Sequence, residues 1–428
     1  MISEKIKILF DARPLRAGAH KNSARSGIYF TALNILKQFI NNENIKLTLF
    51  VPDYGIDDVN KALKIEFPDK KFDIFIYEGE RYEERKNCVK YILTMDKCFI
   101  MQKFIKMTIN TVYFIHNISL YVQMLFNYFK HFGSDVCFSA ANSVPEYIRS
   151  FKPEKIYTVL YDVIPLVLKG YYERSEGNEW FFKLVKSLNS EDYYFTISDY
   201  TKGDFLKYAP QIDSRKMQTV YLGCNIEYNV SKQEDIIKVK EKYGIPQDKK
   251  YLFSLCTIEP RKNLIRIVKT YIDFVKKHNI DDLIFVMGGG NYDAFKKEFD
   301  KIIKGENTDK IYQIGYVDDE DLPALYSGAE WFTFTSQYEG FGLPVLEAMK
   351  CGCPVITSNN SSLPEVIGDA GIMIDYDSDE QHIEAYEKYY YDENLRKENS
   401  QKGMERAKMF TWEKTAEKML EVIMKNNG

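Results

Sequence analysis

The chain has 428 residues, which is too many for one ordinary hydrophobic core and predicts two domains of roughly 200 residues each. With 45% hydrophobic and 28% charged residues, the composition is that of a folded globular protein and excludes extensive disorder. A net charge of −4 argues against a nucleic-acid partner, because affinity for a polyanion requires a surplus of Lys and Arg.

The cysteines argue against a structural zinc site. There are 7 of them, they form no CxxC pair, and they do not group with the 5 histidines. This usage suits a reducing cytoplasm. Cys351 and Cys353 flank one glycine, and a redox pair is one interpretation of them. We favour the other, two small buried residues between a helix and a strand.

Neither a signal peptide nor a transmembrane helix is expected. Charged residues interrupt the N-terminus at Glu4 and Lys5, and the most apolar region, residues 98–132, is broken by Lys103, Lys106 and other polar residues. We predict that this region forms core helices of the N-terminal domain, with contact to a membrane surface as the alternative. The expected location is the cytoplasm, with peripheral association at the inner face of the plasma membrane left open.

Short apolar runs alternate with helix-period segments, a pattern that predicts parallel sheets covered by helices. The first expected strand is residues 6–10, and a helix with an apolar face at Ala32, Ile35 and Phe39 follows Gly27. A second series of expected strands comprises residues 251–256, 283–287, 311–314, 331–335, 354–357 and 371–374. Helices are expected from about Asn263, over 318–329, and from Pro344 as the first helical residue.

The domain boundary is placed in the charged segment 225–250, which has little strand signal. The predicted fold is therefore α/β, with two doubly wound Rossmann-like domains at residues 1–228 and 229–408. A C-terminal helix in 409–428 is expected to pack back on the first domain. Since open parallel sheets bind ligands outside the carboxyl ends of their strands, two facing sheets would form an interdomain cleft.

The segment YEGFGLPVLEAM, residues 338–349, carries two glutamates, Glu339 and Glu347, around two glycines. Glycines and free N–H groups at a helix start admit an anion. Glu347 lies inside the helix, where a carboxylate can accept hydrogen bonds from both hydroxyls of a ribose. Glu339 lies on the loop before it. The alternative is an ordinary helix start at which Glu347 favours the positive end of the helix dipole.

A second candidate is TIEPRKN, residues 257–263, which follows the strand at 251–256. Its Arg261 and Lys262 can hold a diphosphate without a metal ion. The rival is a metal site at Asp375, Asp377 and Asp379, which we predict to be an exposed turn instead. Glycines 288–290 do not form a GxGxxG pattern, so a dinucleotide oxidoreductase is disfavoured.

The C-terminal half closely resembles the large retaining glycosyltransferase family 4, which has the two-Rossmann GT-B fold, and its bacterial mannosyltransferases of surface polysaccharide synthesis. The matching segments are residues 257–263, 315–332, 338–349, 352–371 and 410–423, and more weakly residues 10–16, 26–36, 161–166 and 195–210.

The resemblance implies an acceptor-binding N-terminal domain and a donor-binding C-terminal domain. Arg261 and Lys262 would bind the donor diphosphate, Glu339 would lie by the donor sugar, and Glu347 would hold the ribose. Further donor contacts are implied for Gly27, Cys256, Tyr316, Val317, Gly340, Phe341, Gly342 and Leu343.

Two positions depart from the family pattern. Tyr161-Asp162 stands where many relatives have His-Asp, and both residues are kept as catalytic candidates. A tyrosine cannot act as a base near neutral pH without a large pKa shift, but the donor's own phosphate oxygen is thought to accept the acceptor proton in such enzymes. Cys256 stands where many relatives have glycine, and its small thiol can line the phosphate pocket.

The resulting hypothesis is a metal-independent hexosyltransferase that transfers a sugar, first of all mannose from GDP-mannose, to a glycan or a polyprenyl-diphosphate-linked glycan of a surface polysaccharide such as lipopolysaccharide O-antigen. UDP- and dTDP-linked donors stay open. No cofactor is expected. The alternative is a degenerate nucleotide-sugar-binding partner of a glycan assembly complex, motivated by Tyr161. The acceptor contacts are hypothesised in a basic loop, at Arg13, Arg16, Lys21, Arg25 and Ser26, with an ordinary solvated loop as the alternative.

Overall fold

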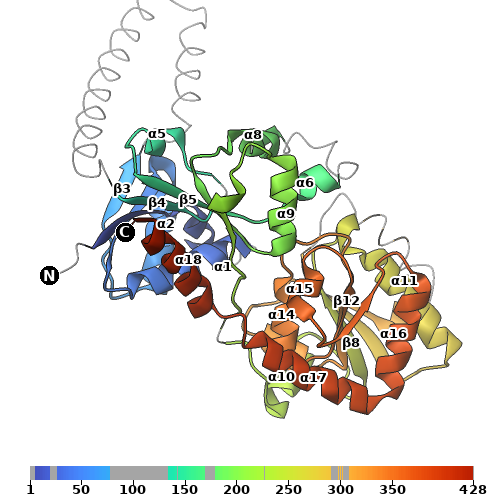
Figure 1. Cartoon of the computed structure of the whole chain (residues 1–428). Coiled ribbons are helices and arrows are strands. Elements are labelled where there is room, and N and C mark those ends of the chain that lie inside the picture. Colours follow the sequence, from blue (N-terminus) through green and yellow to red (C-terminus); the bar gives the residue numbers. More distant parts are fainter. Residues whose placement is uncertain are drawn as a thin grey trace, which may run out of the picture. The chain divides into compact units, whose positions relative to one another are not determined.

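The computed structural model describes residues 5–19, 27–77, 134–141, 143–168, 179–225, 227–290, 297, 299, 301 and 308–427 (Figure 1). The predicted core helices of residues 98–132 lie outside this description. Within the described ranges, no helix has both the length and the apolarity needed to cross a bilayer.

The first sheet has seven strands in the order β3-β2-β1-β4-β5-β6-β7. The pairs from β3 to β5 are all parallel. The strands are β1 (Ile6–Asp11), β2 (Ile45–Pro52), β3 (Ile74–Tyr77), β4 (Val136–Ser139), β5 (Lys155–Leu160), β6 (Tyr193–Thr196) and β7 (Met217–Thr219). The helices between them are α1 (Gly27–Ile40), α2 (Ile56–Glu66), α5 (Glu146–Arg149), α6 (Ile164–Val167), α8 (Glu179–Ser187) and α9 (Asp199–Tyr208), with short 3-10 turns at η1 (Arg13–Ala19), η2 (Asp53–Gly55) and η4 (Ser214–Lys216).

The second sheet has six strands in the order β10-β9-β8-β11-β12-β13, and all of its pairs are parallel. The strands are β8 (Lys250–Leu255), β9 (Leu283–Gly288), β10 (Ile311–Gly315), β11 (Trp331–Phe334), β12 (Val355–Ser358) and β13 (Ile372–Ile374). The helices are α10 (Gln233–Lys242), α11 (Leu264–Lys277), α13 (Leu322–Gly328), α14 (Leu343–Lys350), α15 (Leu363–Ile367), α16 (Asp379–Tyr391), α17 (Glu393–Ala407) and α18 (Trp412–Asn427), with 3-10 turns at η5 (Pro260–Lys262) and η6 (Thr308–Lys310).

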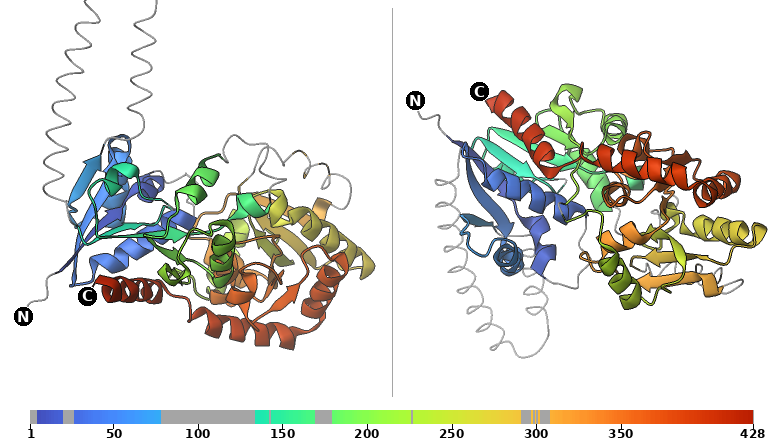
Figure 2. Two further views of the ribbon diagram at one scale, coloured as in Figure 1. Left: turned by 45° about the horizontal axis from the view of Figure 1, so that its top comes forward. Right: turned by 90° about the horizontal axis from the view of Figure 1, so that it is seen from below.

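Helices lie on both faces of the second sheet, and this explains its continuous apolar strands (Figure 2). Successive strand residues point to opposite faces. Leu252 and Trp331 pack into the core formed with α11 and α16. Their neighbours Phe253 and Phe332 face the other side, where both rings pack against Tyr326 of α13. Burial on both faces is what a doubly wound sheet requires.

The chain forms two compact units that divide the first sheet. Unit 1 comprises Met1–Val159, Asp192–Tyr194 and Ile423–Gly428, and unit 2 comprises Leu160–Glu191 and Phe195–Val422. The residues that follow β5 and β6 therefore belong to the same unit as the second sheet. The domain limits predicted at residues 228 and 408 stay predictions.

The predicted strands of the second sheet are confirmed to within one or two residues, and so are the helix starts near Asn263 and Pro344. The helix expected over 318–329 begins only at Leu322. The charged segment that we took for a boundary contains the helix α10, which buries Val239 and Lys240. At the other end of the chain, the last turn of α18 belongs to unit 1. There Lys155 Nζ donates to Asn427 Oδ1 at 2.9 Å, and Asn426 Nδ2 donates to the Tyr157 hydroxyl at 3.2 Å.

Candidate active site

The loop between β11 and α14 owes its shape to two glycines. Gly342 is the N-cap of α14 with φ 111° and ψ 48°, a left-handed conformation that glycine adopts readily and other residues do not. We had predicted Pro344 as the first residue of the helix. The helix begins at Leu343, so Pro344 is its second residue. The backbone of the loop is further held by Ser362, whose hydroxyl donates to the carbonyls of Glu339 and Phe341 at 2.9 Å each.

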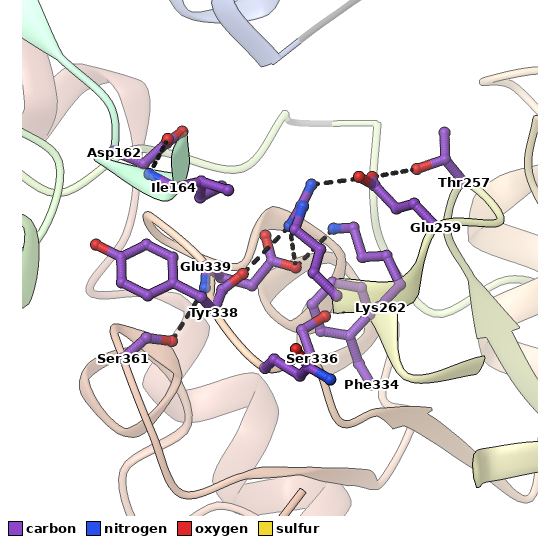
Figure 3. Close-up of polar contacts among 12 residues, drawn as sticks. Asp162, Ile164, Thr257, Glu259, Lys262, Phe334, Ser336, Tyr338, Glu339 and Ser361 are labelled. Atoms are coloured by element: carbon purple, nitrogen blue, oxygen red, sulfur yellow. Dashed lines mark hydrogen bonds and ion pairs between the residues drawn. The ribbon is translucent and has the colours of Figure 1, made fainter. Parts of the chain in front are cut away.

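Arg261 and Lys262 converge on Glu339 (Figure 3). They lie on η5, directly after β8. Arg261 Nη1 and Lys262 Nζ both donate to Glu339 Oε1, at 3.0 Å and 2.6 Å. The three side chains are only 14%, 11% and 11% exposed. Two cations therefore share one nearly buried carboxylate at the carboxyl end of the sheet.

The charge state of Glu339 follows from this geometry. Burial alone would raise the pKa of its carboxyl, but the charges of Lys262 and Arg261 outweigh burial and lower that pKa. Arg261 also pairs with Glu259, whose Oε1 lies 3.1 Å from Nη2, and the Thr257 hydroxyl donates to the same carboxylate oxygen at 2.6 Å. Glu259 and Glu339 thus hold the guanidinium from two directions.

Asp162 and Tyr161 lie beside this cluster. Asp162 Oδ1 accepts from the backbone N–H of Ile164 at the start of α6, at 3.0 Å (Figure 3). Burial raises the pKa of Asp162, and the nearby Arg261, Glu339 and Lys262 act on it electrostatically. The structure therefore brings together all five residues that were predicted to be catalytic, within unit 2. Their roles stay predictions.

Gly340 is where the Tyr161-Asp162 segment meets the glutamate loop. A Cβ at residue 340 would lie 2.2 Å from the Tyr161 carbonyl oxygen and 3.1 Å from Asp162 Cβ. The Gly340 carbonyl accepts hydrogen bonds from the hydroxyls of Ser198, at 2.8 Å, and Thr201, at 3.1 Å. Only a residue without a side chain permits this approach.

Glu347 lies apart from the cation pair, on α14. Its Oε2 accepts a hydrogen bond from the buried Tyr326 hydroxyl at 3.1 Å. Burial raises the pKa of Glu347 to about 7, against the hydrogen bonds from Tyr326 and Tyr228, which lower it. The tyrosine hydroxyls thus favour the carboxylate form of Glu347, and burial opposes it.

This pKa predicts a pH dependence of stability. The folded protein keeps the Glu347 proton up to about pH 7, whereas the unfolded chain releases it near its ordinary pKa of 4.5. Between these values the folded state binds more protons, so the contribution of Glu347 to stability falls as the pH rises, by at most about 3 kcal/mol. Glu347→Gln removes this loss while keeping an acceptor oxygen. The thermal unfolding midpoints of the variant and the wild type are measured from pH 5 to pH 8. The midpoint of the variant minus that of the wild type should increase up to about pH 7 and then stay constant. A pH-independent difference would contradict the assignment.

A cavity of about 240 Å³ lies at the carboxyl ends of β8, β9 and β10. Cys256, Gly289 and Gln313 line it, and burial raises the pKa of the Cys256 thiol to about 11. Of the two other predicted donor contacts that follow β10, Val317 is buried and Tyr316 is 47% exposed. The thiol is therefore protonated near neutral pH and part of a cavity wall, and its contact with the donor stays a prediction.

The remaining predicted residues belong to unit 1 or lie outside the described residues. Gly27 is the first residue of α1. Arg13 forms an ion pair of 2.6 Å with the buried Asp11, and Arg16 lies over the Tyr54 ring at 5.0 Å. Lys21, Arg25 and Ser26 are not described. The acceptor hypothesis for this basic loop stays a prediction.

Comparison with known proteins decides the family. The model of the family described as "Glycosyl transferases group 1" matches residues 235–406, which contain the whole second sheet. The chain is 30% identical over 272 residues to O-antigen chain mannosyltransferase B of Escherichia coli, a match that covers 63% of this chain and 70% of that protein. It is 29% identical over 277 residues to the serotype-specific mannosyltransferase WbdA of Escherichia coli, of which it spans 33%.

The chain belongs to the glycosyl transferases group 1 family. It is therefore a glycosyltransferase enzyme. Solved structures support the fold: HepE of Anabaena, in complex with UDP and glucose, superposes with a TM-score of 0.66 at 13% identity over 98% of this chain and 100% of that chain. A glycosyltransferase of Rickettsia africae gives 0.62 at 16% identity over 98% of each chain. The predicted GT-B fold is confirmed.

Sequence reasoning missed two polar partners in this glycosyltransferase. Glu259 stands inside the TIEPRKN segment but was passed over for the cations that follow it, and Tyr326 was taken only as part of a helix pattern. The signal for Glu259 was available, because a carboxylate two residues before Arg261 is within reach of a guanidinium. Nothing in the spacing points to the Tyr326 hydroxyl bond, which joins two helices.

The metal rival has no support in the described residues, where no group of three or more His, Cys, Asp or Glu is arranged to hold a metal ion. The turn at Asp375, Asp377 and Asp379 is exposed, as predicted, and its carboxylates have other partners. Asp375 accepts from Asn359 Nδ2 at 2.7 Å, and Asp379 pairs with Arg266. Cys351 and Cys353 are buried between α14 and β12, which confirms the interpretation we favoured.

Proposed function

We propose that this glycosyltransferase transfers mannose from GDP-mannose, with retention of anomeric configuration, to a glycan or a polyprenyl-diphosphate-linked glycan of a surface polysaccharide. The convergence of Arg261 and Lys262 on Glu339 at the carboxyl end of the sheet carries the proposal, since a diphosphate donor requires clustered cations there. The mannosyl group and the polysaccharide are suggested by the names of O-antigen chain mannosyltransferase B and WbdA.

Each residue has a separate proposed role. Arg261, Lys262 and the N–H groups at the start of α14 stabilise the negative charge that develops on the departing diphosphate. Glu339 contacts the sugar, and Glu347 accepts hydrogen bonds from the ribose hydroxyls. The bond from the anomeric carbon to the diphosphate breaks, a bond to the acceptor oxygen forms, and the acceptor proton passes to a phosphate oxygen of the leaving diphosphate. No metal ion is needed for this step, and Tyr161 need not act as a base.

The base of the donor is tested by thermal stabilisation with GDP, UDP and dTDP in parallel. A nucleotide present at 100 times its dissociation constant adds about 2.7 kcal/mol to the free energy of unfolding. We expect GDP to raise the unfolding midpoint most, in buffer with and without a chelator. A larger shift with UDP or dTDP would replace the proposed donor, a shift that disappears with the chelator would contradict metal independence, and no shift with any of them would reject a nucleotide-sugar donor.

Turnover separates the enzyme from the inactive binding partner considered above. GDP-mannose incubated with the protein and a mannosylated polyprenyl-diphosphate acceptor should release GDP and form a product whose new linkage keeps the anomeric configuration of the donor, read by NMR. GDP-mannose binding without transfer, and without slow hydrolysis of the donor, would favour the inactive partner. We further propose a peripheral position at the inner face of the plasma membrane, because such an acceptor is embedded there.

A further inference from the structure

The buried Tyr326 contacts Glu347 through its hydroxyl, which has no other hydrogen-bond partner among the described residues. The Tyr326 hydroxyl donates to Glu347 Oε2 at 3.1 Å, and the residue itself is 0% exposed. Glu347 itself is partly exposed. The Glu347 carboxylate is therefore hydrogen-bonded to Tyr326, a residue that is fully buried and that a ligand cannot contact directly.

Three aromatic rings pack around the ring of Tyr326 and fix the position of its hydroxyl. It packs at centroid distances of 5.4 Å against Phe253, 5.2 Å against Phe332 and 6.3 Å against Tyr228. A buried hydroxyl requires a partner, and here that partner is a carboxylate, whose hydrogen bonds are the stronger ones. The nearby Tyr228 hydroxyl also favours the charged form of this carboxyl and lowers its pKa.

We propose that Tyr326 is a positioning residue, whose hydroxyl fixes the Glu347 carboxylate in the orientation that accepts the two ribose hydroxyls of the donor. The inference rests on the proposed ribose role of Glu347. A flexible glutamate side chain would lose conformational entropy when the ribose binds, and this loss would weaken binding. Because the hydrogen bond to the rigid Tyr326 ring already orders the side chain, the loss on binding is smaller.

The test compares nucleotides that have the ribose hydroxyls with nucleotides that lack them. The probes are GDP and UDP, each beside its 2′,3′-dideoxy form, titrated by calorimetry into the full chain, so that a base preference does not hide the ribose effect. The variants are Tyr326→Phe, Glu347→Gln and the two together. Tyr251→Phe is the matched control, because Tyr251 is also buried and its hydroxyl donates to the Leu325 carbonyl of the same helix at 2.7 Å, away from Glu347.

We expect Tyr326→Phe to weaken binding of the nucleotide with the intact ribose about tenfold and to leave the dideoxy form nearly unchanged. Tyr251→Phe should affect both forms equally and slightly. The double variant should bind no more weakly than Glu347→Gln alone, because the hydroxyl acts through the carboxylate.

The outcomes distinguish the two levels of the proposal. Equal weakening of both forms by Tyr326→Phe would show a purely structural tyrosine and overturn the inference. An unchanged preference for the intact ribose in Tyr326→Phe, together with a lost preference in Glu347→Gln, would overturn the inference but keep the role of Glu347. If neither the wild type nor Glu347→Gln distinguishes the two forms, the ribose role itself is wrong.

Discussion

Replacing Arg261 with alanine should lower the turnover number about 10- to 150-fold. The substitution removes at least one charge-assisted hydrogen bond to the departing diphosphate, on the order of 1.5–3 kcal/mol, and each 1.4 kcal/mol corresponds to about a factor of ten. The loss should appear in kcat as well as in kcat/KM, because the bond strengthens as negative charge develops in the transition state. Initial rates of GDP release at saturating acceptor measure it.

Arg266→Ala is the matched control for Arg261→Ala. Arg266 is also an arginine close to the carboxyl end of β8, but it pairs with the exposed Asp379 and not with the cluster around Glu339. Its loss should leave turnover within about twofold, since exposed ion pairs contribute about 0–1 kcal/mol. Full activity of Arg261→Ala, or equal losses in both variants, would reject the diphosphate role. Folding of Arg261→Ala is verified by its unfolding midpoint, and Lys262 still pairs with Glu339 in that variant.

The strands of the second sheet could be predicted because burial on both faces leaves a plain signature. Runs such as residues 251–255 and 331–334 are almost wholly apolar, unlike a half-exposed strand, and are too short and too rich in aromatic residues to favour a helix. Of the first sheet only the strand at residues 6–10 was predicted, and it is confirmed as β1. The start of α14 was predicted one residue late, because Gly342 can take the left-handed N-cap conformation and Leu343 can therefore begin the helix.

The site could be predicted only as separate pieces. Arg261 and Glu339 each follow a strand of the same parallel sheet, so their proximity follows from topology alone. That a single oxygen of Glu339 serves both cations depends on side-chain geometry, which no spacing encodes. The approach of Tyr161 to Gly340 and the bond of Tyr326 to Glu347 join residues far apart along the chain, and periodicity within one element carries no information about them.

Gly340→Ala should lower turnover on the order of a hundredfold while leaving the protein folded. The new Cβ would lie 2.2 Å from the Tyr161 carbonyl oxygen and 3.1 Å from Asp162 Cβ, and neither atom is the far end of a flexible side chain that could move aside. Overpacking of this kind costs roughly 1–3 kcal/mol of stability. Either Tyr161-Asp162 or the loop carrying Glu339 has to shift, and a displacement of about 1 Å at a reacting centre is enough for a hundredfold loss.

Gly203→Ala provides the control for the loss of a glycine. Gly203 lies inside α9, and a Cβ there would meet nothing within 4 Å. Alanine at this helical position should stabilise the protein by about 0.5–1 kcal/mol and leave turnover unchanged. The two variants are compared by their unfolding midpoints and by kcat with GDP-mannose.

An active Gly340→Ala enzyme would show that the contact between Tyr161 and the glutamate loop is dispensable. An inactive one that still binds GDP with wild-type affinity would place the damage at the proposed sugar contact of Glu339 and leave the proposed ribose contact of Glu347 intact.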